Sequence, residues 1–286
     1  MKKQLKGYLI EKYNNMADAY TCHRLLEEAQ KQGIDLKMIG IFDIRDENGR
    51  LYNGDEPLEK RDFVINRFKF GLLKNEINKL ADRQYNNIDG LNTYINKYNQ
   101  VKTLSSEAYI IPKYICAPLT LEYERIVSAL GSPFVLKGLE SSEGKEVFLI
   151  ESEKDYLKIK NENKDYQEWL FEEYIKSSFG RDMRFYSVKG VPVACMERKS
   201  KGDFRANVAL GAGVREIEAT EYMKKAAKDI YEKTGLDFLG IDLLYGETEK
   251  PYFCEINVMA GMSGIEKATG INVAGAVLEA IAKDFE

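Results

Sequence analysis

Apolar and polar positions in the first ninety residues follow two periods, which together predict a small α/β unit. Three short apolar runs predict strands, at GYLI (7–10), LKMIGIF (36–42) and DFVINR (62–67). Between and after them, apolar residues at helical spacing predict helices from about Ala17 to Lys31, ended by Gly33, and from about Lys69 to Arg83. Strand, helix and strand in this order are typical of an α/β domain. The polar, turn-rich segment 86–99 predicts its end, so the first expected domain covers residues 1–95.

From Ser132 onward, short strand patterns alternate with tight turns. PFVLKG and EVFLI flank the loop LESSEGK and predict a hairpin, and a charged helical region follows at about 153–166. WLFEEYI is expected to begin a second β-rich unit, with DMRFYSV and VPVACME joined at Lys189-Gly190. The remaining predicted elements are a helix at about 219–234, the strand pair FLGIDLLY and PYFCEINV, and a helix at about 273–283. The expected domains are therefore 96–170 and 171–286.

Composition narrows the class of protein. At 286 residues, with 44% hydrophobic and 31% charged residues, the chain should fold into about two or three packing units. No apolar run approaches the roughly 20 residues of a spanning helix, and the N-terminal residues lack the apolar segment of a secretory signal, so we expect no membrane contact and a cytoplasmic location. A net charge of −4 gives no general reason to expect nucleic-acid binding. Four distant cysteines and a single histidine, His23, do not indicate zinc, disulfide or histidine chemistry.

Two acidic residues are expected to meet across the last strand pair. If Tyr245 pairs with Tyr252, Asp242 lies opposite Glu255, and Asn257 shares their face. The other face would then be apolar throughout, which constrains the register. Its expected members are Leu239, Ile241, Leu243, Tyr245, Tyr252, Cys254, Ile256 and Val258. Because two facing carboxylates repel, a positive group should compensate them: either a lysine or arginine, or a divalent cation that takes oxygen ligands.

Two other constellations could handle anions. Lys137 leaves a strand just before Ser141, Ser142 and Gly144, a loop that could turn its N–H groups towards a phosphate or could be an ordinary turn. Arg184 follows Asp182 by two residues, and Arg205 precedes Asn207 by two. Arginine forks bind phosphates and carboxylates, although a surface ion pair with Asp182 is the alternative interpretation.

These pieces in this order resemble the ATP-grasp enzymes, and among them the RimK type of carboxylate-amine ligase. The matching text is PFVLKGLESSEGKEV, FEEYIKSSFGRDMRFYSVKGVPVACMERKSKGDFRAN, GLDFLGIDLL and FCEINVMAGMSGIEKATGINVAG, within about residues 96–280. The resemblance implies an α/β and α+β protein with the ATP-grasp fold, in which an N-terminal α/β (pre-ATP-grasp) domain precedes two β-rich subdomains that sandwich ATP. Two departures from the family pattern are SSEGKEV, which is poorer in glycine, and VMAG, which lacks a proline before Gly261.

The resemblance also implies a role for each candidate residue. Those expected to bind the nucleotide are Lys97 (with Lys102 as a rival), Lys137, Ser142, Gly144, the adenine hinge Glu173, Tyr174 and Ile175, and Asp182 near the ribose. Those expected to hold the phosphates or the activated acyl group are Arg184, Arg205 and Asn207. The expected magnesium ligands are Asp242, Glu255 and Asn257, for two Mg²⁺ ions that Mn²⁺ could replace.

The implied activity is ATP-dependent amide or peptide bond formation between a carboxylate and an amine, through an acyl phosphate. The amine or acid substrate could be a small molecule, a peptide or a protein tail, and the resemblance allows a homo-oligomer. Two alternatives remain open: a phosphotransferase that uses no amine, and a nucleotide-binding module without turnover.

Overall fold

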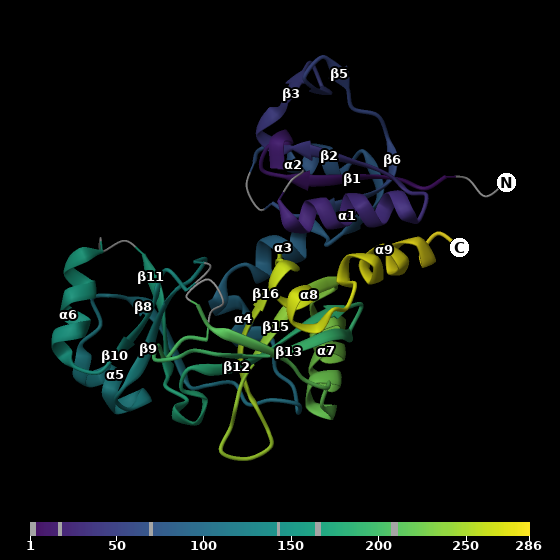
Figure 1. The fold of residues 1–286 in the computed structure, drawn as a ribbon. Coiled ribbons are helices and arrows are strands. Elements are labelled where there is room, and N and C mark those ends of the chain that lie inside the picture. Colours follow the sequence, from purple (N-terminus) through teal and green to yellow (C-terminus); the bar gives the residue numbers. More distant parts are fainter. Residues whose placement is uncertain (1–3, 17–18, 69–70, 142–143, 164–166, 207–210) are drawn as a thin grey trace.

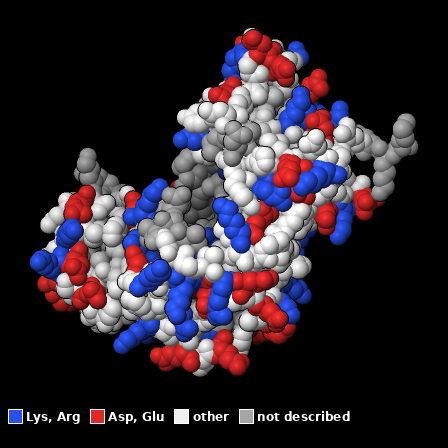
Figure 2. All heavy atoms as spheres, in the orientation of Figure 1, with Lys and Arg blue, Asp and Glu red and all other residues white. Residues whose placement is uncertain are grey.

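The computed structural model describes residues 4–16, 19–68, 71–141, 144–163, 167–206 and 211–286. They form three lobes, one above and two below in Figure 1. None of the helices in these ranges combines the length and the apolar character needed to cross a bilayer. On the face that Figure 2 shows, basic and acidic side chains are intermixed, and the surface is hollowed beside the upper lobe.

The N-terminal lobe is built on a parallel sheet of order β2-β1-β6-β7. Its strands are β1 (Lys6–Glu11), β2 (Asp35–Gly40), β6 (Arg61–Asn66) and β7 (Ala81–Tyr85). Helix α1 (Tyr20–Lys31) links β1 to β2, with the short turns η1 (Asn14–Met16) and η2 (Ile41–Asp43) at the strand ends. A small antiparallel sheet, β3 (Ile44–Glu47), β4 (Arg50–Asn53) and β5 (Glu56–Pro57), projects from this lobe.

Two expectations for this part of the chain are wrong. Within the described part of the helix expected at 69–83, only α2 (Lys74–Asn78) is helical, and strand β7 follows it. Residues 81–85 are a strand because they pair with β6 through main-chain hydrogen bonds, which the spacing of side chains does not encode. The turn-rich segment 86–99 contains α3 (Ile88–Tyr94) and the start of α4 (Lys97–Thr103). Asn87 and Asn96 cap these helices by accepting hydrogen bonds from backbone N–H groups, which is why a polar, asparagine-rich stretch is helical.

The central lobe is an antiparallel sheet of order β10-β9-β11-β8, drawn on the left of Figure 1. Its strands are β8 (Tyr114–Pro118), β9 (Phe134–Gly138), β10 (Val147–Ile150) and β11 (Glu168–Glu173), and α5 (Tyr123–Leu130) and α6 (Glu153–Glu162) pack on it. The hairpin of β9 and β10 was expected. The placement of WLFEEYI in the following unit is wrong, because β11 pairs with both β8 and β9.

The C-terminal lobe carries an antiparallel sheet of order β14-β13-β12-β15-β16. Its strands are β12 (Arg181–Val188), β13 (Val191–Lys199), β14 (Gly213–Glu216), β15 (Phe238–Leu244) and β16 (Tyr252–Asn257), preceded by η3 (Lys176–Ser178). The helices are α7 (Glu221–Thr234), α8 (Ser263–Thr269) and α9 (Val273–Lys283), of which α7 and α9 were expected and α8 was not. Helix α1 of the upper lobe packs against α9, and their apolar side chains share one core.

Candidate active site

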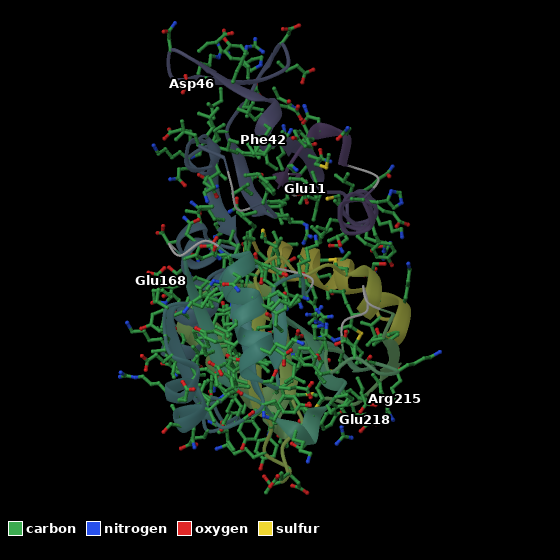
Figure 3. The ribbon with its side chains drawn as sticks, turned by 90° about the vertical axis from the view of Figure 1, so that its left-hand side faces the viewer. Glu11, Phe42, Asp46, Glu168, Arg215 and Glu218 are labelled. Carbon is green, nitrogen blue, oxygen red and sulfur yellow. The ribbon has the colours of Figure 1, made fainter. Side chains whose placement is uncertain are left out.

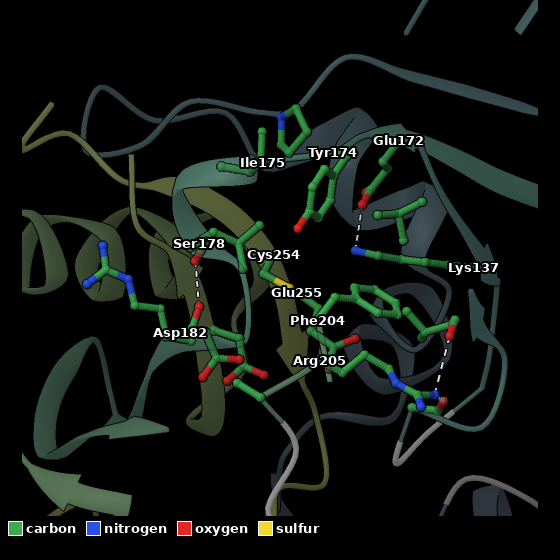
Figure 4. Close-up of a pocket in the computed structure, with 18 of the residues that line it drawn as sticks. Lys137, Glu172, Tyr174, Ile175, Ser178, Asp182, Phe204, Arg205, Cys254 and Glu255 are labelled. Carbon is green, nitrogen blue, oxygen red and sulfur yellow. Dashed lines mark hydrogen bonds and ion pairs between the residues drawn. The ribbon is translucent and has the colours of Figure 1, made fainter. Parts of the chain in front are cut away.

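A pocket of about 870 Å³, including its open mouth, lies between the central and C-terminal sheets. Figure 4 shows side chains from β9, β11, β12 and β16 meeting around it. The structure brings together eleven residues whose side chains or loop the sequence pointed to, and they line the pocket: Lys97, Lys137, Ser141, Gly144, Glu173, Tyr174, Ile175, Asp182, Arg205, Asp242 and Glu255.

The other candidates lie elsewhere. Arg184 and Asn257 are not among the lining residues, but both contact Asp242. Ser142 and Asn207 lie outside the described residues. Of the two rival lysines, Lys97 is buried at the pocket, whereas Lys102 is exposed and places its Nζ over the ring of Tyr98.

Asp242 and Glu255 face each other as expected, but the register of the strands around them differs from the expected one. Asp242 pairs with Glu255 across the β15–β16 ladder, but Leu244, and not Tyr245, pairs with Tyr252. A β-bulge adds one residue to β16 at Cys254, and a bulge breaks the alternation of side chains. The expected position of Cys254 on the core face is therefore wrong: Cys254 lines the pocket beside Glu255, and Phe253 is buried in the core instead. Burial raises the pKa of the Cys254 thiol.

Strand β16 is an edge strand whose position is fixed from outside the sheet. The side-chain amide of Gln100, on α4, is buried and bonds both backbone groups of Ile256, accepting from its N–H at 2.9 Å and donating to its carbonyl at 3.1 Å. Because Glu255 and Asn257 flank Ile256 in sequence, this contact holds both candidate metal ligands in place.

Arginine compensates the buried charge of Asp242, whose side chain is 2% exposed. Arg184 binds it through two hydrogen bonds of 2.6 and 2.5 Å, and Arg198 donates a third at 2.9 Å. Burial alone would raise the pKa of Asp242, but these two guanidinium groups lower it below its ordinary value. Arg198 also binds Asp182 through two hydrogen bonds of 2.7 and 2.5 Å. Asp182 is therefore in an ion pair with an arginine, but this pair is buried and not at the surface.

The residues around Asp242 also fit a hard cation. Asn257 Nδ2 lies 3.4 Å from an Asp242 oxygen and 3.3 Å from a Glu255 oxygen, so its amide stands between the two carboxylates. Turning the amide would present its oxygen at the same point. The nearest cation to Glu255 is Lys97, whose Nζ is 3.7 Å away. Among the described residues no three acidic, histidine or cysteine side chains form a closed metal cage, and a pair of carboxylates that leaves positions for phosphate oxygens is typical of magnesium.

A second buried ion pair crosses the pocket wall between β9 and β11. Lys137 Nζ lies 2.5 Å from Glu172, and both side chains are less than 10% exposed. Burial alone would lower the pKa of Lys137, but the Glu172 carboxylate raises it above its usual range. The sequence reasoning missed Glu172. The signal was present in FEEYI, since neighbouring residues on a strand face opposite ways and only one of the two glutamates can point outward.

Two cations hold the loop that joins β9 to β10. From one side Lys97 Nζ donates to the carbonyl of Ser141 at 2.5 Å, and from the other Arg205 Nη1 donates to the carbonyl of Gly144 at 2.8 Å. Arg205 also forms a bidentate pair with Asp203 at 3.0 and 2.7 Å. This loop, expected over the phosphates, is thus tied to α4 and to the segment that follows β13.

At the opposite wall the chain passes from one sheet to the next. The ladder between β11 and β9 ends at Glu173, and Tyr174 and Ile175 connect β11 to η3 along the pocket. Figure 4 shows Tyr174 and Ile175 above the cavity, with the tyrosine hydroxyl directed into it. Both residues lie at the position expected for an adenine hinge, where the carbonyl of Ile175 accepts a hydrogen bond from the N–H of Ser178 at 3.0 Å.

Comparison with known proteins agrees with this geometry. A family model described as the RimK-like ATP-grasp domain matches residues 95–281. A probable alpha-L-glutamate ligase of Legionella pneumophila (strain Paris) is 30% identical over 92% of both chains. One from Shewanella pealeana is 28% identical over 93% of this chain, which spans only 61% of that longer protein.

Solved structures of low identity show the same fold. The ATP-grasp ligase PsnB, complexed with a minimal precursor, Mg and ADP, superposes with a TM-score of 0.73 at 14% identity over the full length of both chains. D-alanine–D-alanine ligase from Bacillus anthracis gives 0.71 at 16% identity, covering 98% of this chain and 96% of that one. The chain therefore belongs to the RimK-like ATP-grasp family and is, by class, an ATP-dependent carboxylate-amine ligase.

Proposed function

We propose that this protein joins L-glutamate, as the amine, to the carboxylate of a second substrate, with ATP hydrolysed to ADP. The observation that carries the proposal is the Asp242–Glu255 pair, set across one ladder at the pocket between the central and C-terminal sheets. The choice of glutamate is supported by the relatives of similar length, which are named probable alpha-L-glutamate ligases.

In this proposal the pocket binds ATP with its adenine at Tyr174 and Ile175 and its phosphates under the loop 138–146. Lys137 points into the pocket from β9 and would contact phosphate oxygens, held in direction by Glu172. Asp182 would lie near the ribose. Lys97 and Arg205, which now hold loop carbonyls, would stay with the closed loop over the phosphates.

Asp242, Glu255 and Asn257 would hold two Mg²⁺ ions, for which Mn²⁺ could substitute, and these ions would neutralise charge on the transferred phosphoryl group. For Asp242 to contribute an oxygen, Arg184 must give up at least one of its two hydrogen bonds. A released Arg184 would stand at the edge of the reacting groups, where a guanidinium can stabilise the acyl phosphate.

The reaction would then have two steps. The substrate carboxylate attacks the γ-phosphate, giving an acyl phosphate and ADP, and the amine attacks the acyl carbon and expels phosphate. The chain's own contribution is positioning, electrostatic stabilisation and exclusion of water by the loop that Lys97 and Arg205 hold.

The test is a turnover assay with purified protein, ATP, Mg²⁺, L-glutamate and a panel of carboxylic acids and short peptides. We expect phosphate release that requires both the acid and glutamate, and a product heavier by one glutamyl residue in mass spectrometry. Glu255→Gln should lose this activity while keeping its fold. A stable phosphorylated product without amine would favour a phosphotransferase, and ATP binding without turnover would favour a binding module.

A further inference from the structure

The parallel sheet of the N-terminal lobe has a change in the direction of strand order between β1 and β6, outside the residues that line the nucleotide pocket. Strands β1 and β6 lie side by side at its centre, with β2 beyond β1 and β7 beyond β6, so the chain runs outward in opposite directions from this pair. In open α/β sheets, ligands bind at the carboxyl ends of the strands at such a switch point. Here the carboxyl end of β1 is Glu11, and Arg67 directly follows the end of β6.

This edge of the sheet faces the chain segment that follows the candidate metal ligands. Arg67 Nη1 donates to the carbonyl of Ala260 at 3.2 Å, and the N–H of Met262 donates to Thr21 Oγ1 at 3.0 Å. Ala260 is three residues beyond Asn257, a span of at most about 11 Å. Figure 3 shows Glu11 at the lower border of the N-terminal lobe, towards the other two lobes. This edge of the sheet therefore contacts the chain just beyond the candidate metal ligands.

Glu11 and Arg67 face each other without a hydrogen bond between them. Their side chains are 11% and 10% exposed, and Arg67 Nε lies 3.8 Å from Glu11 Oε2, too far for a hydrogen bond. Arg67 Nε is buried and, among the described residues, has no hydrogen-bond partner. The Glu11 oxygens accept from the N–H of Lys12 at 2.9 Å and from the Cys22 thiol at 3.6 Å. A buried donor without an acceptor destabilises the free protein and calls for a partner.

We propose that Glu11 and Arg67 form the binding site for the backbone groups of the α-amino acid substrate, with the α-carboxylate on Arg67 and the α-amino group beside Glu11, which would take up its proton as the amine attacks. A guanidinium edge binds a carboxylate through two donors, and one of those donors on Arg67 is already in place and unused. In an α-amino acid the amino nitrogen and the carboxylate carbon are about 2.5 Å apart. An acid and a guanidinium 3.8 Å apart can therefore each contact one of the two charged groups.

This inference deepens the proposed function and rests on it. The competing interpretation is that Glu11 and Arg67 only tie the N-terminal lobe to the C-terminal one. The two interpretations differ in what they predict for a substrate that lacks the α-carboxylate, because a structural ion pair cannot distinguish that substrate from the natural one.

The test compares L-glutamate with L-glutamate α-amide in the ligase assay, for the wild type, Arg67→Gln, Arg67→Lys and Glu11→Gln. Arg61→Gln is the matched control, since Arg61 begins the same strand and is 8% exposed, but it binds Asp35 at the far end of the sheet. We expect the wild type to prefer glutamate over its amide by at least tenfold in kcat/KM. Arg67→Gln should raise the KM for glutamate at least tenfold and abolish the preference, with the KM for ATP unchanged.

Arg67→Lys keeps the positive charge but loses the second hydrogen-bond donor of the guanidinium, so it should retain part of the preference for glutamate over its amide. It also provides a second test if Arg67→Gln fails to fold. Glu11→Gln should raise the KM for both amine substrates, and Arg61→Gln should change neither KM. The inference is overturned if the wild type turns over but Arg67→Gln or Arg67→Lys keeps the full preference, or if both amine substrates react equally well with the wild type. If the wild type shows no amine-dependent turnover at all, the proposed function fails first.

Discussion

Asp242 and Glu255 share one face of one strand pair, yet their removal should have very different effects on stability. Asp242 is 2% exposed and receives two hydrogen bonds from Arg184 and one from Arg198. Breaking a buried ion pair by removing one partner typically costs about 3–5 kcal/mol. Arg198 keeps its two bonds to Asp182, and Arg184, at 23% exposed, can reach water, so we expect a loss of about 2–4 kcal/mol for Asp242→Ala.

Glu255 contributes much less to the free energy of unfolding. Its side chain is 27% exposed, and its nearest cation is Lys97 at 3.7 Å. Partly exposed pairs of this kind contribute about 0–1 kcal/mol, so Glu255→Ala should change the free energy of unfolding by no more than about 1 kcal/mol. Both variants should nevertheless lose the proposed ligase activity, because each lacks one carboxylate of the acidic pair.

Urea unfolding measures this difference directly. Far-UV circular dichroism follows the whole chain, and the fluorescence of the one tryptophan, Trp169, follows the central lobe, in which it is buried. Asp242→Ala should lower the midpoint with an unchanged slope, and Asp242→Ala combined with Arg184→Ala should lose little more than the single variant. Equal losses for Asp242→Ala and Glu255→Ala, or no loss for either, would refute the account of Asp242 as the centre of a buried ionic cluster.

Three further perturbations follow from the described contacts. Glu172→Ala leaves the Lys137 ammonium buried without its partner and should cost about 3–5 kcal/mol in urea unfolding, most of which a second change, Lys137→Met, should restore. Gly180→Ala should cost about 1–3 kcal/mol in the same assay, because Gly180 has φ +64° and a Cβ there would lie 2.8 Å from the carbonyl oxygen of Asp203. Burial raises the pKa of Asp237 to about 6, although Lys189 opposes this. The protonated Asp237 therefore stabilises the fold below about pH 4, and this contribution is lost as the pH rises through 6. Asp237→Asn should raise the free energy of unfolding by about 1–3 kcal/mol over the wild type at pH 7.5 and should not change it at pH 4.

The sequence could predict the acidic pair because its evidence is local. Alternation along FLGIDLLY and PYFCEINV places Asp242 opposite Glu255 if Tyr245 pairs with Tyr252; Leu244 pairs with Tyr252 instead, and the bulge at Cys254 restores the pair. The bulge at Cys254 could not be predicted from the sequence, because no turn residue marks it and the alternation of apolar and polar residues fits a strand without a bulge equally well. With the bulge, the ring of Phe253 is buried in the core.

Features that depend on strand order could not be predicted. Arg198 reaches Asp242 only because β12 lies between β13 and β15, an order that no pattern within the strands encodes. The same is true of Glu11 and Arg67, which are 56 residues apart and meet because β1 and β6 are neighbours. The family resemblance supplied roles for motif residues in the later two lobes, but the N-terminal lobe has no comparable motif.

The charges around the pocket explain why nucleotide binding should require a divalent cation. Five cationic side chains at or beside the pocket each have a carboxylate within 4 Å, in the pairs Lys137–Glu172, Arg198–Asp182, Arg184–Asp242, Arg205–Asp203 and Lys97–Glu255. Apart from Arg181, which lies over the ring of Tyr245, a triphosphate that enters therefore meets cations whose charge is already compensated, and it brings further negative charge next to Asp242 and Glu255. Mg²⁺ supplies the missing positive charge and also relieves the repulsion between phosphate and carboxylate oxygens. Calorimetric titration with ATP should accordingly show binding at least tenfold tighter with Mg²⁺ than with EDTA, and Glu255→Gln should narrow that difference. Equal affinity in both conditions would mean that the arginines and lysines alone compensate the phosphates.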